Sequence, residues 1–387
     1  MEAHFAEFIR SANSLRPQWR HMWLNPAGNI HPMIQQAIAD GLKSSHDVKR
    51  IGAIRLPSIP RILRAAHTRR LCKKAGATIG VVWNKTTRSE FFLDALGAAN
   101  VIHWEHGRAW HAGREKERQR YLDRVRLVIA NSNAARRVLQ LRWGYSGEIR
   151  VCLNGLRPSL VPASLQEKKY PRGRPIRLGT VARLQPVKGV PLAIHTANLL
   201  RNAGLDVQLR IAGDGPERGN LEKLVAQLGL ESQVRFPGVV RDMASFYSSI
   251  DCLIHLPLTE AFGLVGLEAA AYGCPVIAAA VDGLTESVRD GVSGRCLRPS
   301  LPLSEYERLG SGTSDVPPEV YDPLEDRMRP AQLVDPAVAA AALQTLFADS
   351  QSYEDTSRAA ARRVLSEFRF EDHVNAVLEV IESVARR

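Results

Sequence analysis

The sequence lacks the cysteine patterns that mark a disulfide framework or a zinc site. Its five cysteines are scattered, odd in number and without a C-x-x-C pair, whereas disulfide-rich domains and zinc sites carry paired or closely spaced cysteines. No apolar run approaches the roughly 18–20 residues that a membrane-spanning helix needs. The opening stretch, MEAHFAEFIRSANS, has no apolar core of a secretory signal. We therefore expect a reduced, cytoplasmic protein.

Acidic residues are scarce in the first part of the chain. Residues 1–160 hold 27 of the 52 Lys and Arg but only 11 of the 40 Asp and Glu, a net charge of +16, so residues 161–387 carry −4. Such a field attracts an anionic membrane face, an anionic substrate or nucleic acid. Alternatively, the basic residues belong to arginine-rich helices that face solvent and bind no partner. Aromatic residues make up only 6% of the chain and do not interleave with the charges, so nucleic acid is not an expected partner.

The length of 387 residues favours two domains. Short β-branched segments alternate with helical stretches, which is typical of α/β proteins. The alternation occurs twice, so we expect two doubly wound, Rossmann-like domains facing a cleft. The expected boundaries are 1–165 for an N-terminal domain with an extension at 1–18, and 166–175 for a linker containing YPRGRP. A C-terminal domain is expected at 176–370, with a long insertion at 300–335 that is an excursion or a lid. Residues 371–387 are expected to form a helix packing back toward the N-terminal domain.

The expected strands can be read from apolar and β-branched runs bounded by turn residues. They are HMWL, IGAIRL, TIGVVW, NVIHWEH, LVIANS and IRVCLNG in the first series, and IRLGTVARL, VQLRIAGDGP, VRFPG, DCLIHL and PVIAAAV in the second. Between them we expect helices, among them one from about His31 to Leu42. A further helix from Asp372 to Arg386 closes the chain.

Two glutamates stand in an otherwise apolar segment, TEAFGLVGLEAAAYGCPV. Glu260 follows the expected strand DCLIHL, and open α/β sheets bind ligands at the carboxyl ends of their strands. Glu268 lies about two turns into the next helix, on the side that a ribose would reach. By themselves the two residues also fit a helix N-terminal carboxylate and a surface charge. The first residues of that helix offer free N–H groups to a phosphate: Phe262, Gly263 and Leu264.

Two cations follow the first strand of the second series. GTVARLQPVKGV places Arg183 and Lys188 in one loop. Two fixed cations at a strand's carboxyl end can hold a diphosphate and stabilise negative charge on a departing nucleotide. A pair of exposed basic residues is the alternative.

The stretch IAGDGPERG is similar to a dinucleotide fingerprint but does not have its spacing. Its glycines give G-x-G-x-x-x-G, and Pro216 interrupts the pattern. We interpret it as a tight turn from a strand to a helix, and a dehydrogenase is not expected.

Five motifs in order resemble the donor half of the retaining GT-B glycosyltransferases of glycosyltransferase family 4. They are GTVARL-x-x-x-KG, AGDGP, FPG, the pair of glutamates eight residues apart and DGLTESV, between about Leu178 and Pro299. The resemblance implies that Arg183 and Lys188 contact the donor diphosphate. It also implies that Glu260 meets the sugar hydroxyl groups and that Glu268 meets the nucleotide ribose.

The N-terminal half resembles this family more weakly. VIHWEHGRAW is similar to the family's strand that ends in a histidine facing the transferred sugar, and His106 is the matching residue. NPAGN occupies the place of the glycine-rich loop after the first strand, with Gly28 alone where the family usually has two glycines. His103, His106 and His111 also admit a metal cluster, but their spacing fits no zinc pattern. We expect no metal, because the chain has no D-x-D and the two cations can neutralise the diphosphate.

The resemblance implies a retaining, metal-independent hexosyltransferase. Its donor would be a UDP- or GDP-linked sugar, with no further cofactor, and its acceptor a saccharide or glycolipid of lipopolysaccharide or exopolysaccharide biosynthesis. The basic segments Arg61–Lys74 and Gly113–Arg126 are the expected contacts with anionic lipid at the inner membrane face, or with an anionic glycolipid acceptor. A GT-B epimerase or phosphorylase, and a non-enzymatic basic binding protein, are the alternative functions.

Overall fold

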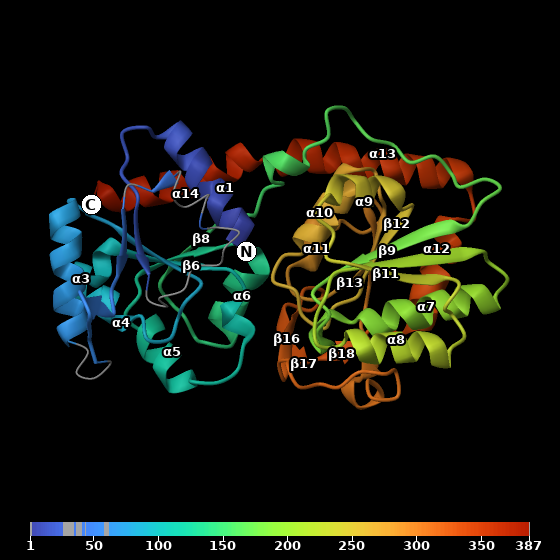
Figure 1. Ribbon diagram of the computed structural model, residues 1–387, viewed down its shortest axis with the longest axis horizontal. Helices are drawn as coiled ribbons and strands as arrows, with labels where there is room; N and C mark the ends of the chain where they lie inside the picture. The colour runs from blue at the N-terminus through green and yellow to red at the C-terminus, as the bar shows by residue number, and fades with distance from the viewer. Residues whose placement is uncertain (1, 26–34, 36–40, 43, 58–61, 387) are drawn as a thin grey trace. The chain divides into compact units, whose positions relative to one another are not determined.

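The protein forms two compact units in the computed structural model, which describes residues 2–25, 35, 41–42, 44–57 and 62–386 (Figure 1). The division into units is Met1–Asn131, Leu139–Arg157 and Phe370–Arg387 for unit 1, and Ser132–Val138 and Pro158–Arg369 for unit 2. Among the described residues, no helix is both long and apolar enough to span a lipid bilayer.

Unit 1 contains a four-stranded parallel sheet with the order β5-β6-β7-β8. Its strands are β5 (Gly80–Trp83), β6 (Val101–Glu105), β7 (Leu127–Ala130) and β8 (Glu148–Val151). Two strands pair separately and in parallel, β1 (Met22–Asn25) and β2 (Ser44–Asp47). All residues of β6 and β7 are buried, as expected for the centre of a parallel sheet.

The predicted strand IGAIRL is wrong, because this segment is a hairpin of two very short strands. These are β3 (Arg50–Ile51) and β4 (Ile54–Arg55), which pair antiparallel. Gly52 turns the chain between them with φ of 57°, a left-handed conformation that glycine adopts without steric cost. Gly28 and most of the predicted helix His31–Leu42 lie outside the described residues.

The helices assigned wholly or mainly to unit 1 include both ends of the described chain. They are α1 (Glu2–Leu15), α3 (Ile62–Ala75), α4 (Glu90–Leu96), α5 (Glu115–Leu122) and α14 (Phe370–Ala385). Helix α6 (Asn133–Leu141) is divided between the units, with residues 133–138 assigned to unit 2. Helices α1 and α14 lie side by side (Figure 1) and bury apolar residues in one cluster with Trp104 of β6. An ion pair between Arg16 and Glu382, 2.7 Å long, joins the two helices.

Two buried histidines join α1 to α14 through a single hydrogen bond. The Nε2 atoms of His4 and His373 are 3.1 Å apart, and His373 Nδ1 lies 2.7 Å from the carbonyl oxygen of Leu153. His373 therefore donates through Nδ1, and when its ring is neutral its Nε2 accepts from Nε2 of His4. Burial lowers the pKa of His373 to about 4. Burial also lowers the pKa of His4 well below its usual value, and the neighbouring His373 lowers it further.

We expect this histidine pair to make the protein sensitive to acid. Between pH 6.5 and about 4 the unfolded chain protonates His373 while the folded chain does not, so the unfolded state binds more protons and stability falls as pH decreases. The slope expected from one histidine is about 1.4 kcal/mol per pH unit, roughly 3 kcal/mol over the window. Urea unfolding of wild type and His373→Gln at successive pH values measures it. Equal slopes for the two proteins would contradict this prediction.

Unit 2 contains a six-stranded, all-parallel sheet with the order β11-β10-β9-β12-β13-β14. In chain order this is 3-2-1-4-5-6, the arrangement of a Rossmann fold. The strands are β9 (Ile176–Val181), β10 (Val207–Ala212), β11 (Val234–Gly238), β12 (Cys252–His255), β13 (Val276–Ala279) and β14 (Gly294–Leu297). The strands predicted in the second series are thereby confirmed.

Helices cover both faces of this sheet, with α7 and α8 on one side and α9 and α10 on the other (Figure 1). The helices of unit 2 are α7 (Val190–Asn202), α8 (Arg218–Gln227), α9 (Met243–Ser249), α10 (Leu264–Ala271), α11 (Leu284–Ser287), α12 (Pro336–Leu346) and α13 (Ser350–Glu367). The turn between β10 and α8 confirms the interpretation of IAGDGPERG. At Gly213 (φ 133°) an added Cβ would lie 1.8 Å from the carbonyl oxygen of Ala182, so only glycine fits.

The segment predicted as a linker, 166–175, lies within unit 2, to which the chain returns at Pro158. Side-chain hydrogen bonds fasten the segment. Lys168 Nζ donates to the carbonyl oxygens of Tyr247 and Ser248 at 2.8 and 2.7 Å. The hydroxyl group of Tyr170 donates to the carbonyl oxygen of Phe347 at 2.8 Å. Proline and glycine here mark a surface segment packed on unit 2.

The insertion 300–335, interpreted from its composition as a long excursion or lid, is a packed part of unit 2. It contains β15 (Leu301–Pro302), β16 (Glu319–Asp322), β17 (Arg327–Pro330) and β18 (Gln332–Leu333), with β16 pairing with β17 and β15 with β18. Tyr306 is fully buried and Tyr321 is 8% exposed. These two aromatic side chains anchor a segment whose Pro, Ser and acidic residues suggest an excursion.

Candidate functional site

The predicted donor residues lie on two loops that leave neighbouring strands of unit 2. Strands β9 and β12 are adjacent at the centre of the sheet, where the chain order reverses, and a hydrogen bond from Thr180 Oγ1 to the carbonyl oxygen of Ile254 joins them at 3.1 Å. Arg183 and Lys188 follow β9, and Glu260 follows β12. In doubly wound sheets this switch point opens a ligand-binding crevice at the carboxyl ends of the strands.

The structure brings Lys188 and Glu260 together. Lys188 Nζ donates to Glu260 Oε2 at 2.7 Å, and His255 Nε2 lies 3.6 Å from the same oxygen. Burial alone would raise the pKa of Glu260, but the positive charge of Lys188 and the contact with His255 hold it well below its usual value. Glu260 is therefore a fixed carboxylate at neutral pH, which can accept hydrogen bonds from hydroxyl groups.

Arg183 stays open to solvent at the end of β9. Its side chain forms no hydrogen bond or ion pair with the residues that the structure describes. Lys188 lies at the end of a single 3-10 turn, Pro186–Lys188, and Gly189 then begins α7 with φ of 65°. An added Cβ at Gly189 would lie 1.9 Å from the carbonyl oxygen of Leu256, so glycine holds the Lys188 loop close to the end of β12.

Asp282 positions the loop of Glu260, a role that the sequence does not predict. Its side chain is fully buried, and its carboxylate accepts hydrogen bonds from Thr259 Oγ1, from the Glu260 backbone N–H at 3.0 Å and from the Tyr321 backbone N–H at 2.7 Å. Its φ of 48° lies in the left-handed region, where aspartate is tolerated at a cost. In the sequence, Asp282 directly follows the strand PVIAAAV and begins the motif DGLTESV.

Helix α10 begins at Leu264, with Gly263 as the preceding cap residue and φ of 85°. Phe262 turns its ring into the interior, 2% exposed and 6.2 Å from the ring of Phe368. The three residues predicted to offer N–H groups therefore stand at the start of a helix, and its partial positive charge faces the same edge of the sheet as Glu260.

Glu268 is buried in α10, which rules out the surface charge considered from the sequence. It is 7% exposed, and the hydroxyl group of Tyr247 donates to its Oε2 at 2.8 Å. Tyr247 itself is fully buried on α9. Tyr247 thus orients one carboxylate oxygen of Glu268, and no motif had singled it out.

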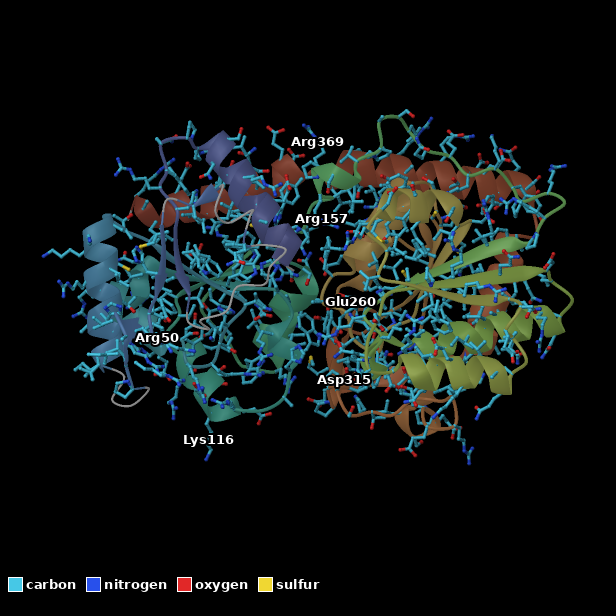
Figure 2. The ribbon with its side chains drawn as sticks, in the orientation of Figure 1. Arg50, Lys116, Arg157, Glu260, Asp315 and Arg369 are labelled. Carbon is cyan, nitrogen blue, oxygen red and sulfur yellow. The ribbon has the colours of Figure 1, made fainter. Side chains whose placement is uncertain are left out.

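The insertion 300–335 supports the Lys188 loop. The hydroxyl group of Tyr306 donates to the carbonyl oxygen of Pro186 at 2.6 Å, and Asp315 accepts from the backbone N–H of Val187 at 3.1 Å. Figure 2 labels Glu260 and Asp315, which lie along the same side of unit 2. Because these contacts join residues more than a hundred positions apart, local sequence patterns could not reveal them.

In unit 1, His106 follows β6 and stacks on Trp83, with ring centroids 4.4 Å apart and an interplanar angle of 17°. Burial lowers the pKa of His106 well below its usual value, and the nearby His4 lowers it further. Its Nε2 atom is buried and has no hydrogen-bond partner among the described residues. Asn84 Oδ1 accepts from the backbone N–H groups of His106 and Arg108 at 3.0 and 3.2 Å, so Asn84 shapes this turn.

The alternative of a metal cluster at the three histidines finds no support. His103 Nε2 lies 3.2 Å from Glu105 Oε2, and its Nδ1 lies 3.4 Å from the hydroxyl group of Tyr121. Both ring nitrogens of His103 therefore have protein partners. In the described part of the chain, no group of three or more His, Cys, Asp or Glu side chains is arranged to hold a metal ion.

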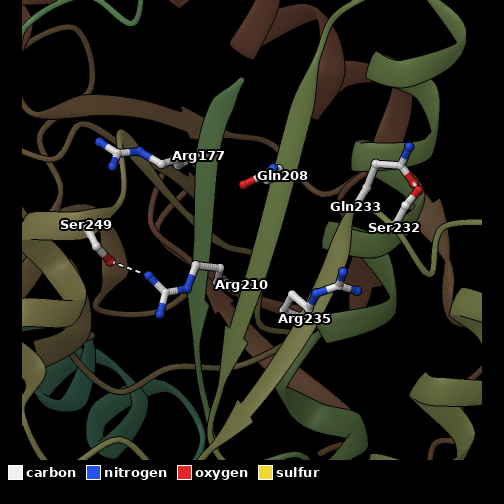
Figure 3. Close-up of a pocket in the computed structure, with 7 residues that line it drawn as sticks. All are labelled: Arg177, Gln208, Arg210, Ser232, Gln233, Arg235 and Ser249. Carbon is white, nitrogen blue, oxygen red and sulfur yellow. Dashed lines mark hydrogen bonds between the residues drawn. The ribbon is translucent and has the colours of Figure 1, made fainter. Parts of the chain in front are cut away.

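A cavity of about 310 Å³ lies at the opposite edge of the unit 2 sheet, near the amino ends of β9, β10 and β11 (Figure 3). Its arginines have partners in the protein and point in different directions. Arg177 pairs with Asp251 at 3.0 Å, Arg210 donates to Ser249 Oγ at 2.6 Å, and Arg235 donates to backbone carbonyl groups. This cavity is separate from the candidate site.

The stretch of chain that carries the candidate donor residues matches a known protein family. Residues 164–304 match the family described as Glycosyl transferases group 1, a range that includes Arg183, Lys188, Glu260 and Glu268. The chain is also similar to the D-inositol 3-phosphate glycosyltransferase of Nocardia farcinica, with 31% identity over 214 residues, 51% of this chain and 47% of the relative. The matched stretch therefore spans about half the length of that relative.

Solved structures share the fold across nearly the whole chain. A glycosyltransferase from Rickettsia africae has a TM-score of 0.75 at 14% identity, covering 99% of this chain and 95% of the other. The Anabaena protein HepE in complex with UDP and glucose has a TM-score of 0.68 at 18% identity, covering 98% and 96%. The predicted GT-B fold and the resemblance to the group 1 glycosyltransferases are thereby confirmed.

Proposed function

We propose that this protein is a retaining, metal-independent glycosyltransferase that uses a nucleoside diphosphate sugar, with UDP or GDP as the carrier. The observation that carries the proposal is the pairing of Lys188 with Glu260 at the switch point between β9 and β12, within the stretch 164–304 that matches the group 1 glycosyltransferases. The Anabaena structure contains UDP and glucose, which supports UDP as the first donor to test.

The proposed donor extends across the carboxyl edge of the unit 2 sheet. Arg183 and Lys188 neutralise the charge that develops on the diphosphate as its bond to the sugar breaks. Glu260 accepts hydrogen bonds from the sugar hydroxyl groups, and Glu268 accepts from the ribose. The helix start at Phe262, Gly263 and Leu264 offers backbone N–H groups to phosphate oxygens.

We assign His106 to the transferred sugar. Its unpartnered Nε2 and its neutral ring suit a hydrogen bond with a hydroxyl group. We expect His106→Ala to keep the nucleoside diphosphate affinity of wild type and to lower the transfer rate by about tenfold or more, since one hydrogen bond to the sugar is lost. Calorimetric titration and initial rates measure the two quantities. A variant with normal turnover but a lower melting temperature would show a purely structural histidine.

The acceptor in this proposal is a saccharide or glycolipid that carries an anionic group. Burial lowers the pKa of Lys85, which follows β5 beside Asn84, and four neighbouring cations lower it further: Lys49, Arg88, Arg108 and Arg64. None of the five forms a side-chain ion pair within the described residues. An anion would relieve this repulsion, and the names of the relatives include an inositol phosphate. We place the reaction in the cytoplasm, in lipopolysaccharide or exopolysaccharide biosynthesis.

Incubation with UDP- and GDP-linked sugars tests the proposal. Proton NMR of the anomeric signal, with inositol phosphate or lipid-linked saccharides as acceptors, follows both the reaction and its stereochemistry. Transfer, or slow donor hydrolysis, with the anomeric configuration kept is the expected result. Inversion of the anomeric configuration would contradict the retaining assignment. Free epimerised sugar would indicate an epimerase, and phosphate-dependent turnover would indicate a phosphorylase. Binding without turnover would indicate a basic binding protein.

We expect Glu268→Gln to weaken nucleoside diphosphate binding by roughly tenfold to a hundredfold. The neutral amide loses charge-assisted hydrogen bonds to the ribose, each worth about 1.5–3 kcal/mol. Glu222→Gln on α8, at an exposed glutamate, is the matched control and should bind like wild type. Fluorescence or calorimetric titration measures the dissociation constants. If Glu268→Gln binds the nucleotide as tightly as wild type, the ribose assignment is wrong.

A further inference from the structure

The hairpin of β3 and β4 carries two solvent-exposed isoleucine side chains. Ile51 and Ile54 are directly opposite one another and are 49% and 71% exposed. Two further aliphatic residues at the start of α3, Ile62 and Leu63, are 70% and 45% exposed. Ile54 and Ile62 are among the most exposed large apolar residues of the described chain. We call these four residues the aliphatic patch.

The hairpin and α3 are held together at their bases. Arg64, 8% exposed, donates through Nη2 to the carbonyl oxygen of Leu56 at 3.0 Å. The backbone N–H of Leu56 in turn donates to the carbonyl oxygen of Lys49 at 2.7 Å. From the sequence, Arg64 is predicted to lie in a segment that contacts lipid headgroups. Because Arg64 is buried, it instead joins α3 to the chain after the hairpin.

The segment that carries the aliphatic patch is strongly basic, and Asp47 lies at its edge, where it accepts from the backbone N–H of Lys49 at 2.7 Å. Residues 48–89 contain eleven Lys and Arg and no Asp or Glu. Arg50 and Arg55 are directly opposite one another in the hairpin and both are exposed. Like charges in this position destabilise a strand pair, and an isolated two-stranded hairpin is only marginally stable. An anion between or beside the two guanidinium groups would stabilise the hairpin.

We propose that the aliphatic patch and the Arg50–Arg55 pair form a docking surface for an anionic lipid bilayer. Alternate residues of a strand point to opposite faces, so the hairpin offers an isoleucine pair on one face and an arginine pair on the other. Isoleucines suit the boundary between headgroups and acyl chains, and arginines bind headgroup phosphates. The exposed Arg70, Lys73 and Lys74 of α3 add to the positive field.

The aliphatic component distinguishes a bilayer from other anionic partners. Nucleic acid neutralises cations but offers no apolar medium to exposed isoleucines. Proteins that bind single-stranded nucleic acid do so through aromatic stacking. A second copy of this chain would bring two patches of like charge together, which repel at physiological salt. This proposal goes beyond the transferase activity and does not depend on it.

Vesicle co-sedimentation of the full chain tests the docking surface. We expect binding to vesicles of phosphatidylcholine with phosphatidylglycerol, none to phosphatidylcholine alone, and weaker binding at higher salt. Ile51→Ser with Ile54→Ser should lower the affinity by about tenfold, because their apolar surface no longer leaves water. Val239→Ser in unit 2, at a residue 73% exposed, is the matched control and should bind like wild type. Arg50→Glu with Arg55→Glu should abolish binding.

Each result has one meaning. Equal binding to neutral vesicles, no binding at low salt, or unchanged binding of the isoleucine variant would overturn the proposal. Salt-sensitive binding to an oligonucleotide that the isoleucine substitutions abolish would also overturn the proposal. A dimer in sedimentation equilibrium that the same substitutions abolish would do so too. The rise in melting temperature with UDP, measured on the same variants, reports on unit 2 alone. A retained rise with lost vesicle binding shows folded protein, so failure of the docking surface and failure of the transferase proposal remain distinguishable.

Discussion

Replacing Lys188 by alanine is expected to lower kcat/KM for sugar transfer by roughly 30- to 1000-fold, or about 2–4 kcal/mol of transition-state stabilisation. The ammonium group is proposed to neutralise the leaving diphosphate, and it also holds Glu260 at 2.7 Å. Arg183→Ala should lose a comparable amount of transition-state stabilisation, because it removes the neutralisation of the diphosphate but leaves the contact with Glu260. The exposed Lys223 on α8 supplies the matched control, Lys223→Ala, which should turn over normally.

The Lys188 substitution should also change the pH profile. In wild type the charge of Lys188 opposes the effect of burial and keeps the pKa of Glu260 well below its usual value, so Glu260 contributes no acid limb in an ordinary assay range. Without Lys188, burial acts with less opposition, the pKa rises, and activity should fall on the acid side. Near-normal turnover in both Arg183→Ala and Lys188→Ala, with an unchanged pH profile, would contradict the diphosphate assignment.

Replacing Glu260 by glutamine is expected to lower kcat by roughly a hundredfold while the affinity for free nucleoside diphosphate stays within about twofold. The change removes the charge that accepts from the sugar but leaves the shape, and Asp282 continues to fix the loop through the Glu260 backbone. Steady-state rates and nucleotide titration separate the two effects. Glu222→Gln on α8, at an exposed glutamate, is the matched control and should turn over normally. A loss confined to nucleotide affinity would instead place Glu260 at the diphosphate or the ribose.

The fold of unit 2 and its donor residues could be predicted because their signals are local. A strand followed by Arg183 and Lys188, and a strand followed by Glu260, place charges at strand ends without knowledge of distant contacts. Tyr247 could not be assigned in this way, and although Asp282 also follows a strand, its position alone does not reveal its partners. Asp282 acts through hydrogen bonds to Thr259, Glu260 and Tyr321, and only the folded sheet brings these residues together.

Composition is a poor guide where one or two residues decide the local structure. The insertion 300–335 is rich in Pro, Ser and acidic residues, yet Tyr306 anchors it to the carbonyl oxygen of Pro186. In unit 1, IGAIRL has the composition of one strand, but the left-handed Gly52 folds it into a hairpin. The basic segment of α3 contains Arg64, whose burial follows from a backbone acceptor on another element.

The most direct test of the account is whether unit 2 binds a nucleoside diphosphate at the carboxyl edge of its sheet. Melting temperatures of wild type, Lys188→Ala and Lys223→Ala are measured with UDP, GDP and ADP, since a ligand that binds only the folded state raises the melting temperature by mass action. The account predicts that one of the three raises it for wild type and Lys223→Ala and raises it much less for Lys188→Ala. No rise with any of them, or an equal rise in all three proteins, would contradict it.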